Sequence, residues 1–263
     1  MILEKIISEI ERCYPRKNAE KWDNVGLLIG DRKREIKKII LALDADMETI
    51  DYAIEEKADL LITHHPFIFN PIKDINTDTL LGEKIIKSIK KDLAIYSIHT
   101  NIDSSFQGLN EYILSKIGVE KFKILDEKTE DNKTGIGRYY KTDKEYRVEE
   151  YIELIKEKLD LDKVILYSED SEHLKPIKKI ALINGAGISY WKKARFFGCD
   201  TIITGDVKYH EALDAIEAGM KVIDLGHYES EKLFFELMEF KIKESFLDLL
   251  IIKKIKPPIW RVI

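Results

Sequence analysis

The amino-acid sequence predicts an α/β protein made of two similar α/β lobes, and three observations support this fold class. Short β-rich runs alternate with amphipathic helical runs along the chain. Residues 36–63 and 177–204 align without a gap and share 10 identities in 28 positions. Hydrophobic residues make up 44% of the 263 residues and are spread evenly, so each half can bury a core. The alternation favours parallel strands, because parallel neighbours must be joined by a crossover element.

The first lobe is predicted over residues 1–126. Charged residues interrupt the aliphatic residues of 1–13, a pattern typical of an amphipathic helix and not of a signal peptide. Short runs rich in Ile, Leu and Ala predict the strands of this lobe, at 36–44, 60–63 and 93–98. Apolar residues at helical spacing predict its further helices, at 47–57, 79–91 and 108–117.

The second lobe is predicted over residues 127–263, after a polar, turn-rich stretch at 128–133. The same criteria predict its strands, at 136–140, 164–167, 177–183, 201–204 and 221–224. They also predict its helices, at 148–159, 188–197, 209–217 and from about Tyr228. The Ile-rich tail, 249–263, is expected to add one more strand and could pack back on the first lobe.

The internal match has a constant offset of 141 residues, which pairs Asp59 with Asp200 and Thr63 with Thr204. After a gap the correspondence resumes, with 94–99 opposite 222–227. A duplication would give two lobes that face each other, with a cleft where the strand ends meet, which is the usual place for ligands in open sheets. The features shared by all strand–helix–strand units are the alternative explanation for part of the match.

Composition narrows the function classes. The formal net charge of −5 gives no overall attraction to nucleic acids or acidic membranes, and no run approaches the ~18 apolar residues of a membrane-spanning helix. Two cysteines, Cys13 and Cys199, are too few for a disulfide framework, so we expect a cytoplasmic protein. Abundant Lys, Glu and Ile with a single Gln, Gln107, is typical of proteins from hyperthermophiles.

Histidines cluster at predicted strand ends. His64 and His65 follow the strand at 60–63, and Pro66 ends it. Adjacent residues of an extended segment point to opposite sides, so this pair is better placed to bind two ions than to share one. An ordinary polar loop after a buried strand is the alternative.

His227 and Glu231 lie four residues apart and therefore on one face of the predicted helix. His99 and Asp103 repeat this spacing, although Asn101 favours a loop there. Such pairs also occur on ordinary surface helices. Taken together, these nitrogen and oxygen donors suit Zn, Fe, Mn, Co or Ni, and the absence of nearby cysteines argues against a structural zinc site.

Five motifs in series carry a family resemblance: 22–27 (WDNVGL), 62–66 (ITHHP), 99–103 (HTNID), 204–210 (TGDVKYH) and 226–231 (GHYESE). In this order they resemble the Nif-three-like family, also known as domain of unknown function thirty-four, whose members carry the label GTP cyclohydrolase I type 2 homologue. The resemblance covers the full chain, without the central domain that some members carry. It implies two α/β lobes, a dinuclear metal centre between them and a homohexameric ring.

Position by position, the resemblance implies five ligands for two divalent metal ions per chain: His64, His65, Asp103, His227 and Glu231, with Glu231 bridging. It places His99 near the site without binding metal, where it would orient Asp103 or substrate. A two-metal centre activates water at neutral pH, which points to a hydrolase acting on a nucleotide or related small molecule. His210, then His99, are the candidates for proton transfer in catalysis.

For three further residues and one segment, the sequence allows both a functional and an ordinary structural interpretation. His210 could be an ordinary surface residue, and Asp206 could cap the helix that follows it. Trp22 is expected in a core more than as a platform for a base. The segment 184–189 could hold an anion on its N–H groups or form a tight turn.

Two other functions remain open. The first is a nucleic-acid-binding ring with structural or regulatory metals, since lysines recur at helical spacing at 84, 87, 90 and 91, and cationic residues again at 192, 193 and 195. The solvated face of a charged helix explains the same pattern. The second is a metal carrier or regulator without turnover.

Overall fold

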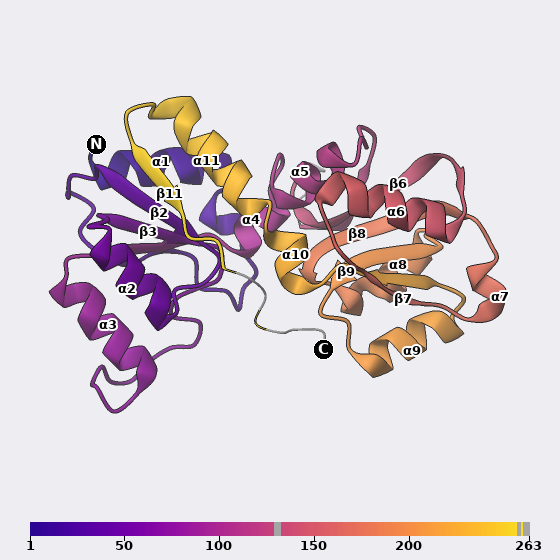
Figure 1. Ribbon diagram of the computed structural model, residues 1–263, viewed down its shortest axis with the longest axis horizontal. Helices are drawn as coiled ribbons and strands as arrows, with labels where there is room; N and C mark the ends of the chain where they lie inside the picture. The colour runs from indigo at the N-terminus through magenta and orange to yellow at the C-terminus, as the bar shows by residue number, and fades with distance from the viewer. Residues whose placement is uncertain (129–132, 257–258, 260–263) are drawn as a thin grey trace. The chain divides into compact units, whose positions relative to one another are not determined.

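The computed structural model describes residues 1–128, 133–256 and 259 (Figure 1). The chain forms two compact units, the first from Met1–Ile102 with Phe234–Ile263 and the second from Asp103–Leu233. The predicted boundary at 126/127 thus lies inside the second unit. The reason is that the strands on either side of it pair with each other, so the polar stretch 128–133 connects two strands of one sheet. Residues 129–132 of that stretch lie outside the described part.

The first unit contains a five-stranded sheet in the order β1-β4-β3-β2-β11. Its strands are β1 (Gly26–Ile29), β2 (Lys38–Ala42), β3 (Leu60–Thr63), β4 (Ala94–Ser97) and β11 (Leu250–Lys253). β11, β2, β3 and β4 are parallel, and β1 runs antiparallel to β4 at the edge. The predicted parallel arrangement is confirmed, and the described part of the Ile-rich tail supplies β11.

Helices cover both faces of this sheet. They are α1 (Leu3–Cys13), α2 (Met47–Glu55), α3 (Leu80–Lys90) and α11 (Phe234–Ser245), with a short 3-10 turn, η1 (Arg16–Asn18). Since β2, β3 and β4 are adjacent and parallel, right-handed crossovers place α2 and α3 on the same face. α1 and α11 pack together on the other face (Figure 1).

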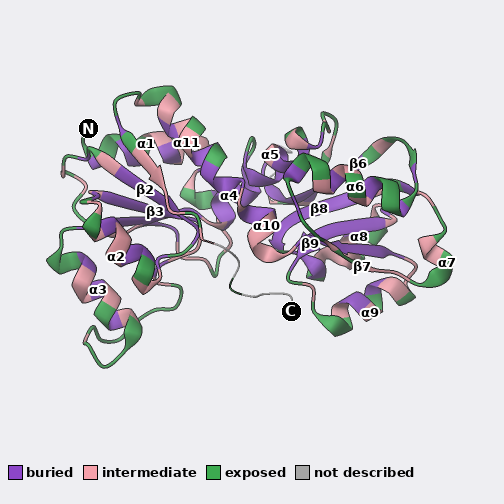
Figure 2. Cartoon of the chain, viewed as in Figure 1, coloured by how far each residue is buried: buried purple, intermediate pink, exposed green. Residues whose placement is uncertain are grey.

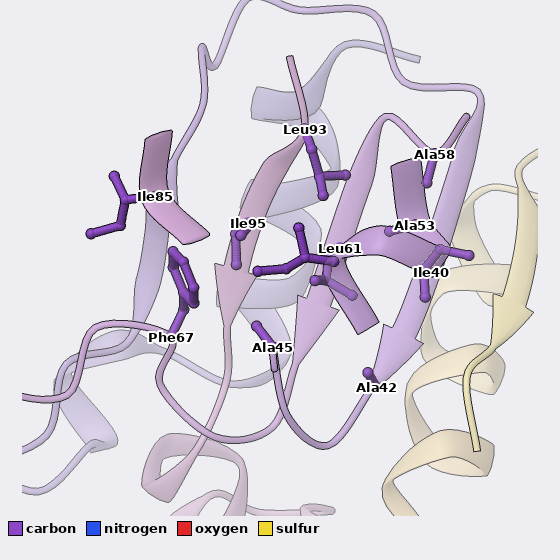
Figure 3. Close-up of a cluster of buried hydrophobic side chains, with 11 residues drawn as sticks. Ile40, Ala42, Ala45, Ala53, Ala58, Leu61, Phe67, Ile85, Leu93 and Ile95 are labelled. Carbon is purple, nitrogen blue, oxygen red and sulfur yellow. The ribbon is translucent and has the colours of Figure 1, made fainter. Parts of the chain in front are cut away.

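The core beneath α2 and α3 explains this arrangement. Buried side chains from β2, β3 and β4 meet side chains from the two helices and Phe67 (Figure 3). Ile40, Leu61 and Ile95 are fully buried at its centre. Each such aliphatic side chain contributes about 1.5–3 kcal/mol by leaving water. In Figure 2 the central strands β2 and β3 are correspondingly buried, whereas the exposed residues lie on the outer faces of the helices.

The second unit contains a six-stranded sheet in the order β5-β6-β8-β9-β10-β7. Its strands are β5 (Lys123–Glu127), β6 (Gly135–Tyr146), β7 (Ile165–Tyr167), β8 (Ile177–Ala186), β9 (Thr201–Gly205) and β10 (Lys221–Asp224). β8, β9 and β10 are parallel, whereas β5, β6 and β7 add antiparallel pairings at the two sides. β5 has no counterpart among the predicted strands, because three of its five residues are charged.

The helices of the second unit are α5 (Leu109–Lys116), α6 (Val148–Leu159), α7 (Asp170–His173), α8 (Trp191–Phe196), α9 (Tyr209–Glu217) and α10 (His227–Glu231), with the 3-10 turn η2 (Ile188–Tyr190). The predicted helices 148–159 and 209–217 match to the residue. A further helix, α4 (Thr100–Ser104), replaces the loop expected around Asn101. The Asn101 side chain accepts from the His99 N–H and donates to the Tyr14 carbonyl, so it supports this helix.

Contacts repeat between the units at the offset of 141 residues. The carboxylate of Asp59 accepts from the N–H groups of Lys37 and Lys38, and that of Asp200 accepts from those of Lys178 and Lys179. The ammonium groups of Lys38 and Lys179 each donate to the carbonyl at the end of the following helix, at Glu56 and Phe197. The general pattern of strand–helix–strand units does not require such identical side-chain bonds, so they favour duplication.

The next strand corrects the predicted alignment by one residue. Leu60 pairs with Ala94 in the first sheet, and its counterpart Thr201 pairs with Lys221 in the second. The strand starting at Ala94 therefore corresponds to the one starting at Lys221, not at Val222. His99 and His227 become equivalent only if one residue is inserted after β10, in the second unit.

Among the described residues, no helix is long and apolar enough to cross a membrane.

Candidate metal centre

The first unit gathers three histidines at the carboxyl ends of its parallel strands. His64 and His65 follow β3, and His99 follows β4, the neighbouring strand. Each of the three can offer a ring nitrogen, and these nitrogens lie within 4.8 Å of one another. This spacing suits the binding of a metal ion by imidazoles. The sequence placed all three histidines at strand ends, but it set His99 apart as a residue that does not bind metal.

The tautomers of His64 and His65 follow from their hydrogen bonds. His64 is buried, and its Nδ1 lies 2.9 Å from the carbonyl oxygen of Ile98. Nδ1 of His65 lies 2.9 Å from Oδ1 of Asp44. Since both partners are acceptors, each Nδ1 carries the proton and donates it. In the neutral ring Nε2 then holds the lone pair, which is the arrangement of a metal-binding histidine.

His99 forms a pair with Asp23, a residue for which the sequence suggested no role. Nδ1 of His99 lies 3.1 Å from Oδ1 of Asp23, whose side chain is fully buried. The N–H and hydroxyl groups of Thr100 donate to the other carboxylate oxygen. Burial raises the pKa of Asp23, but the hydrogen bonds from His99 and Thr100 outweigh it and the net pKa is lowered. Asp23 is therefore a carboxylate that fixes the His99 ring.

The second unit carries a histidine and two carboxylates of the predicted set. His227 and Glu231 lie one turn apart on α10, with Nε2 3.1 Å from Oε2. Nδ1 of His227 lies 2.7 Å from the carboxylate of Asp206, so this histidine has the same tautomer as His64 and His65. Asp206 is not the cap of α9, whose N-cap residue is Lys208.

Glu231 is buried against the backbone of Gly185. A Cβ atom on Gly185 would lie 2.5 Å from Oε1 of Glu231, and φ of this glycine is +61°. The segment 184–189 is the end of β8 followed by the start of η2, and the N–H groups of Gly185 and Gly187 donate to the hydroxyls of Ser230 and Thr204. The lack of a side chain at Gly185 leaves room for the Glu231 carboxylate.

Asp103 is held by asparagines. The side-chain amide of Asn184 donates to Oδ1 of Asp103 at 2.8 Å, and Asn110 donates to the Asp103 carbonyl. Asn110 also accepts from the Asn184 N–H, so the three residues form one network. The sequence does not link Asn184 or Asn110 to Asp103, because they lie 81 and 7 residues from it and no motif connects them.

We expect Asn184→Leu to weaken metal binding about 10- to 100-fold, the usual effect of losing a side chain that orients a ligand. Removing the amide leaves the Asp103 carboxylate without its 2.8 Å donor. Metal titration against a competing chelator measures the effect. Asn76→Leu, on an exposed loop of the first unit, is the control; equal affinities in both variants would contradict a role for Asn184.

The structure leaves two predicted residues elsewhere. His210 is exposed at the start of α9, and its only interaction among the described residues is an edge contact with Tyr209. Trp22 is 57% exposed, so the expectation of a core position is wrong. Cys199 is buried, and burial raises the pKa of its thiol to about 12.

Comparisons of the sequence and of the structure with known proteins point to the same family. A family model described as Duf34/NIF3 (NGG1p interacting factor 3) matches residues 1–258. A protein of Clostridium perfringens named GTP cyclohydrolase 1 type 2 homolog is 42% identical over 261 residues, covering 98% of both chains. The structure of reduced HcgD from Methanocaldococcus jannaschii is similar, with a TM-score of 0.82, 32% identity and coverage of 96% and 97%. A Bacillus cereus protein related to NIF3 has the same fold, with a TM-score of 0.86, 23% identity and 99% coverage of both chains.

Proposed function

Because this chain belongs to the Duf34/NIF3 family, we propose that it is a metal-dependent hydrolase with two divalent ions, acting on a nucleotide or related small molecule. The ligands we propose are His64, His65, Asp103, His227 and Glu231. The name GTP cyclohydrolase 1 type 2 homolog, carried by relatives, agrees with a nucleotide substrate.

The observation that carries the proposal is the common state of the three proposed histidine ligands. His64, His65 and His227 each donate Nδ1–H to an oxygen, from the Ile98 carbonyl and the carboxylates of Asp44 and Asp206. An imidazole held in this way offers Nε2 to a metal without rearrangement. The three histidines and the two buried carboxylates, Asp103 and Glu231, form a mixed set of nitrogen and oxygen donors. Such a set fits Zn, Fe, Mn, Co or Ni better than Mg or Ca, which prefer oxygen ligands.

Two bound divalent ions supply Lewis acidity and an activated water for hydrolysis. The chain itself supplies the proton-transfer group. Nδ1 of His99 is hydrogen-bonded to Asp23. The other ring nitrogen, Nε2, is therefore the one that can accept a proton from substrate or return it. Trp22 lies edge-on to the His99 ring, at 6.0 Å between centroids. His210 remains the second candidate for proton transfer.

Metal content per chain tests the proposal. We expect about two equivalents after anaerobic purification without an affinity tag, and a sharp fall in Glu231→Gln. Glu217→Gln, an exposed glutamate of α9, is the matched control and should keep wild-type content. Close to no metal in the wild type, unrecovered on adding Zn, Mn, Fe, Co or Ni, would refute the dinuclear hydrolase.

The role of His99 gives a separate prediction. We expect His99→Gln to keep the metal content and to lower turnover of GTP about 10²- to 10⁴-fold, the usual contribution of general acid–base catalysis. Asp23→Asn should act in the same direction, because the His99 ring loses its carboxylate. Metal analysis and product formation by chromatography are measured on the same samples. Loss of metal in His99→Gln would instead identify His99 as a ligand.

Nucleic-acid binding by a homohexameric ring remains a prediction. The lysines behind it are partly engaged, since Lys87 pairs with Asp51 and Lys193 with Asp126. Light scattering measures the assembly, and oligonucleotide binding at two salt concentrations measures the interaction, which should weaken as salt rises.

A further inference from the structure

We infer that the first unit carries a nucleotide-binding subsite, in which Trp22 and Phe69 stack on the base and Arg16 and Lys17 bind a phosphate. This inference rests on the proposed function and names the groups that would hold its substrate. It is built from four features within the first unit.

The first feature is a pair of exposed aromatic rings beside His99. Trp22 is 57% exposed and Phe69 is 48% exposed. Their ring centroids are 5.7 Å apart at an interplanar angle of 47°, and the edge contact of Trp22 with His99 places them next to the catalytic candidate. Leaving two large rings in contact with water is unfavourable, whereas a planar heterocycle stacked on them recovers this surface.

The second feature is that hydrogen bonds fix the segments that carry these rings. Glu20 lies two residues before Trp22, and its N–H donates to the Thr100 hydroxyl. Asp23 directly follows Trp22, and its carboxylate accepts from the Thr100 N–H. The Asn24 amide donates to the carbonyl of Ile68, the residue before Phe69. A platform that is already held in place loses less conformational entropy when a ligand binds.

The third feature is a cationic hollow that shares Asp23 with the site. Its volume is about 390 Å³, and Arg16, Lys17, Glu20 and Asn24 line it with Asp23. Arg16 and Lys17 are exposed. Among the described residues neither cationic group has an ion pair, whereas many other lysines and arginines do. The Asp23 carboxylate is buried against His99 and Thr100, so the charges at the hollow's surface are two cations and the single carboxylate of Glu20, and this net positive charge favours an anionic ligand group.

The fourth feature is the place of Arg16 relative to the strand ends. The Arg16 side chain lies over Gly26, where a Cβ atom would approach Nε to 2.7 Å. Gly26 pairs with Ser97, two residues before His99. The cation, the rings and His99 thus all lie at the same end of β1 and β4. A planar base linked through a sugar to a phosphate presents the matching order of an apolar face and an anion.

Three probes separate the two parts of the subsite: guanosine 5′-monophosphate, guanosine and ribose 5-phosphate. Binding is measured by equilibrium dialysis with metal-loaded protein. We expect Trp22→Ala to weaken binding of the nucleotide and the nucleoside about 5- to 100-fold, the range for loss of one base–aromatic stack. Binding of ribose 5-phosphate should stay the same, and Trp22→Phe should restore most of the loss. Phe196→Ala, an exposed aromatic residue of the second unit, is the control.

The double variant Arg16→Ala with Lys17→Ala should weaken binding of the nucleotide and of ribose 5-phosphate about tenfold or more, with less effect at high salt, and leave guanosine unchanged. Lys121→Ala with Lys123→Ala, an exposed pair of the second unit before and at the start of β5, is the charge-matched control. The inference is wrong if the wild type binds no nucleotide, or if Trp22→Ala changes the oligomeric state without changing nucleotide affinity.

This binding assay does not depend on turnover. Normal nucleotide binding in a protein that lacks two metal equivalents would refute the proposed hydrolase and keep the subsite. Two metal equivalents without nucleotide binding would refute the subsite and keep the proposed hydrolase.

Discussion

Arg138→Met is expected to lower the free energy of unfolding by about 3–5 kcal/mol, the usual cost of breaking a buried ion pair. Arg138 is fully buried and lies 2.8 Å from the carboxylate of Glu111. Its other N–H groups donate to the carbonyls of Gly135, Gly137 and Ser105. Without the guanidinium, Glu111 stays charged and buried, and three carbonyls lose their donor. Urea-induced unfolding followed by circular dichroism measures the effect.

Two further variants make this prediction specific. Lys141→Met removes an exposed charge from the same strand and should change stability by less than about 0.5 kcal/mol. Adding Glu111→Leu to Arg138→Met removes the orphaned carboxylate and should recover part of the loss. A single variant as stable as the wild type would show that the network does not stabilise the second unit.

Gly185→Ala is expected to reduce metal affinity at least tenfold while the protein stays folded. The new Cβ would lie 2.5 Å from Oε1 of Glu231 and 3.8 Å from Cε1 of His227, so the carboxylate must move. The positive φ adds a backbone cost of about 1–2 kcal/mol, which is a small part of the stability of a protein of this size. Competition with a chelator measures metal affinity, and thermal unfolding checks the fold.

Gly198→Ala is the matched control for this variant. Its φ is +76°, close to that of Gly185, but among the described residues no neighbouring atom lies within 4 Å of the point where its Cβ would stand. It therefore carries the same backbone cost without displacing a carboxylate. Equal metal affinity in the two variants would assign the effect to backbone strain and not to displacement of Glu231.

The fold could be predicted from the sequence because its signals are local. The period of apolar residues located α6 and α9 to the residue, and the offset of 141 pointed to duplication before any contact was known. β5 was missed because its charged residues hide the apolar pattern of a strand. The unit boundary was placed too late, since strand pairing between β5 and β6 is a contact that no local signal reveals.

The candidate site could be predicted only in part, for the same reason. The position of His64 and His65 at a strand end could be predicted, because an apolar run precedes them and Pro66 follows them. The residues that orient the histidines lie far from them in sequence: Asp23 is 76 residues from His99, and Asp44 is 21 residues from His65. A carboxylate in a turn looks the same whether it faces solvent or an imidazole. A core position is predicted for Trp22 because aromatic residues are mostly buried, and sequence alone carries no signal of its 57% exposure.

The position of β11 has a consequence for biosynthesis. This strand completes the first sheet beside β2, with Leu250 opposite Lys38. At about 5–20 residues per second, a ribosome releases it on the order of 10–40 s after β2. Until then the edge of β2 is open to pairing with other chains. The second unit is continuous in sequence and can fold while it waits. Nascent chains of this protein therefore need protection at one sheet edge until synthesis is nearly finished.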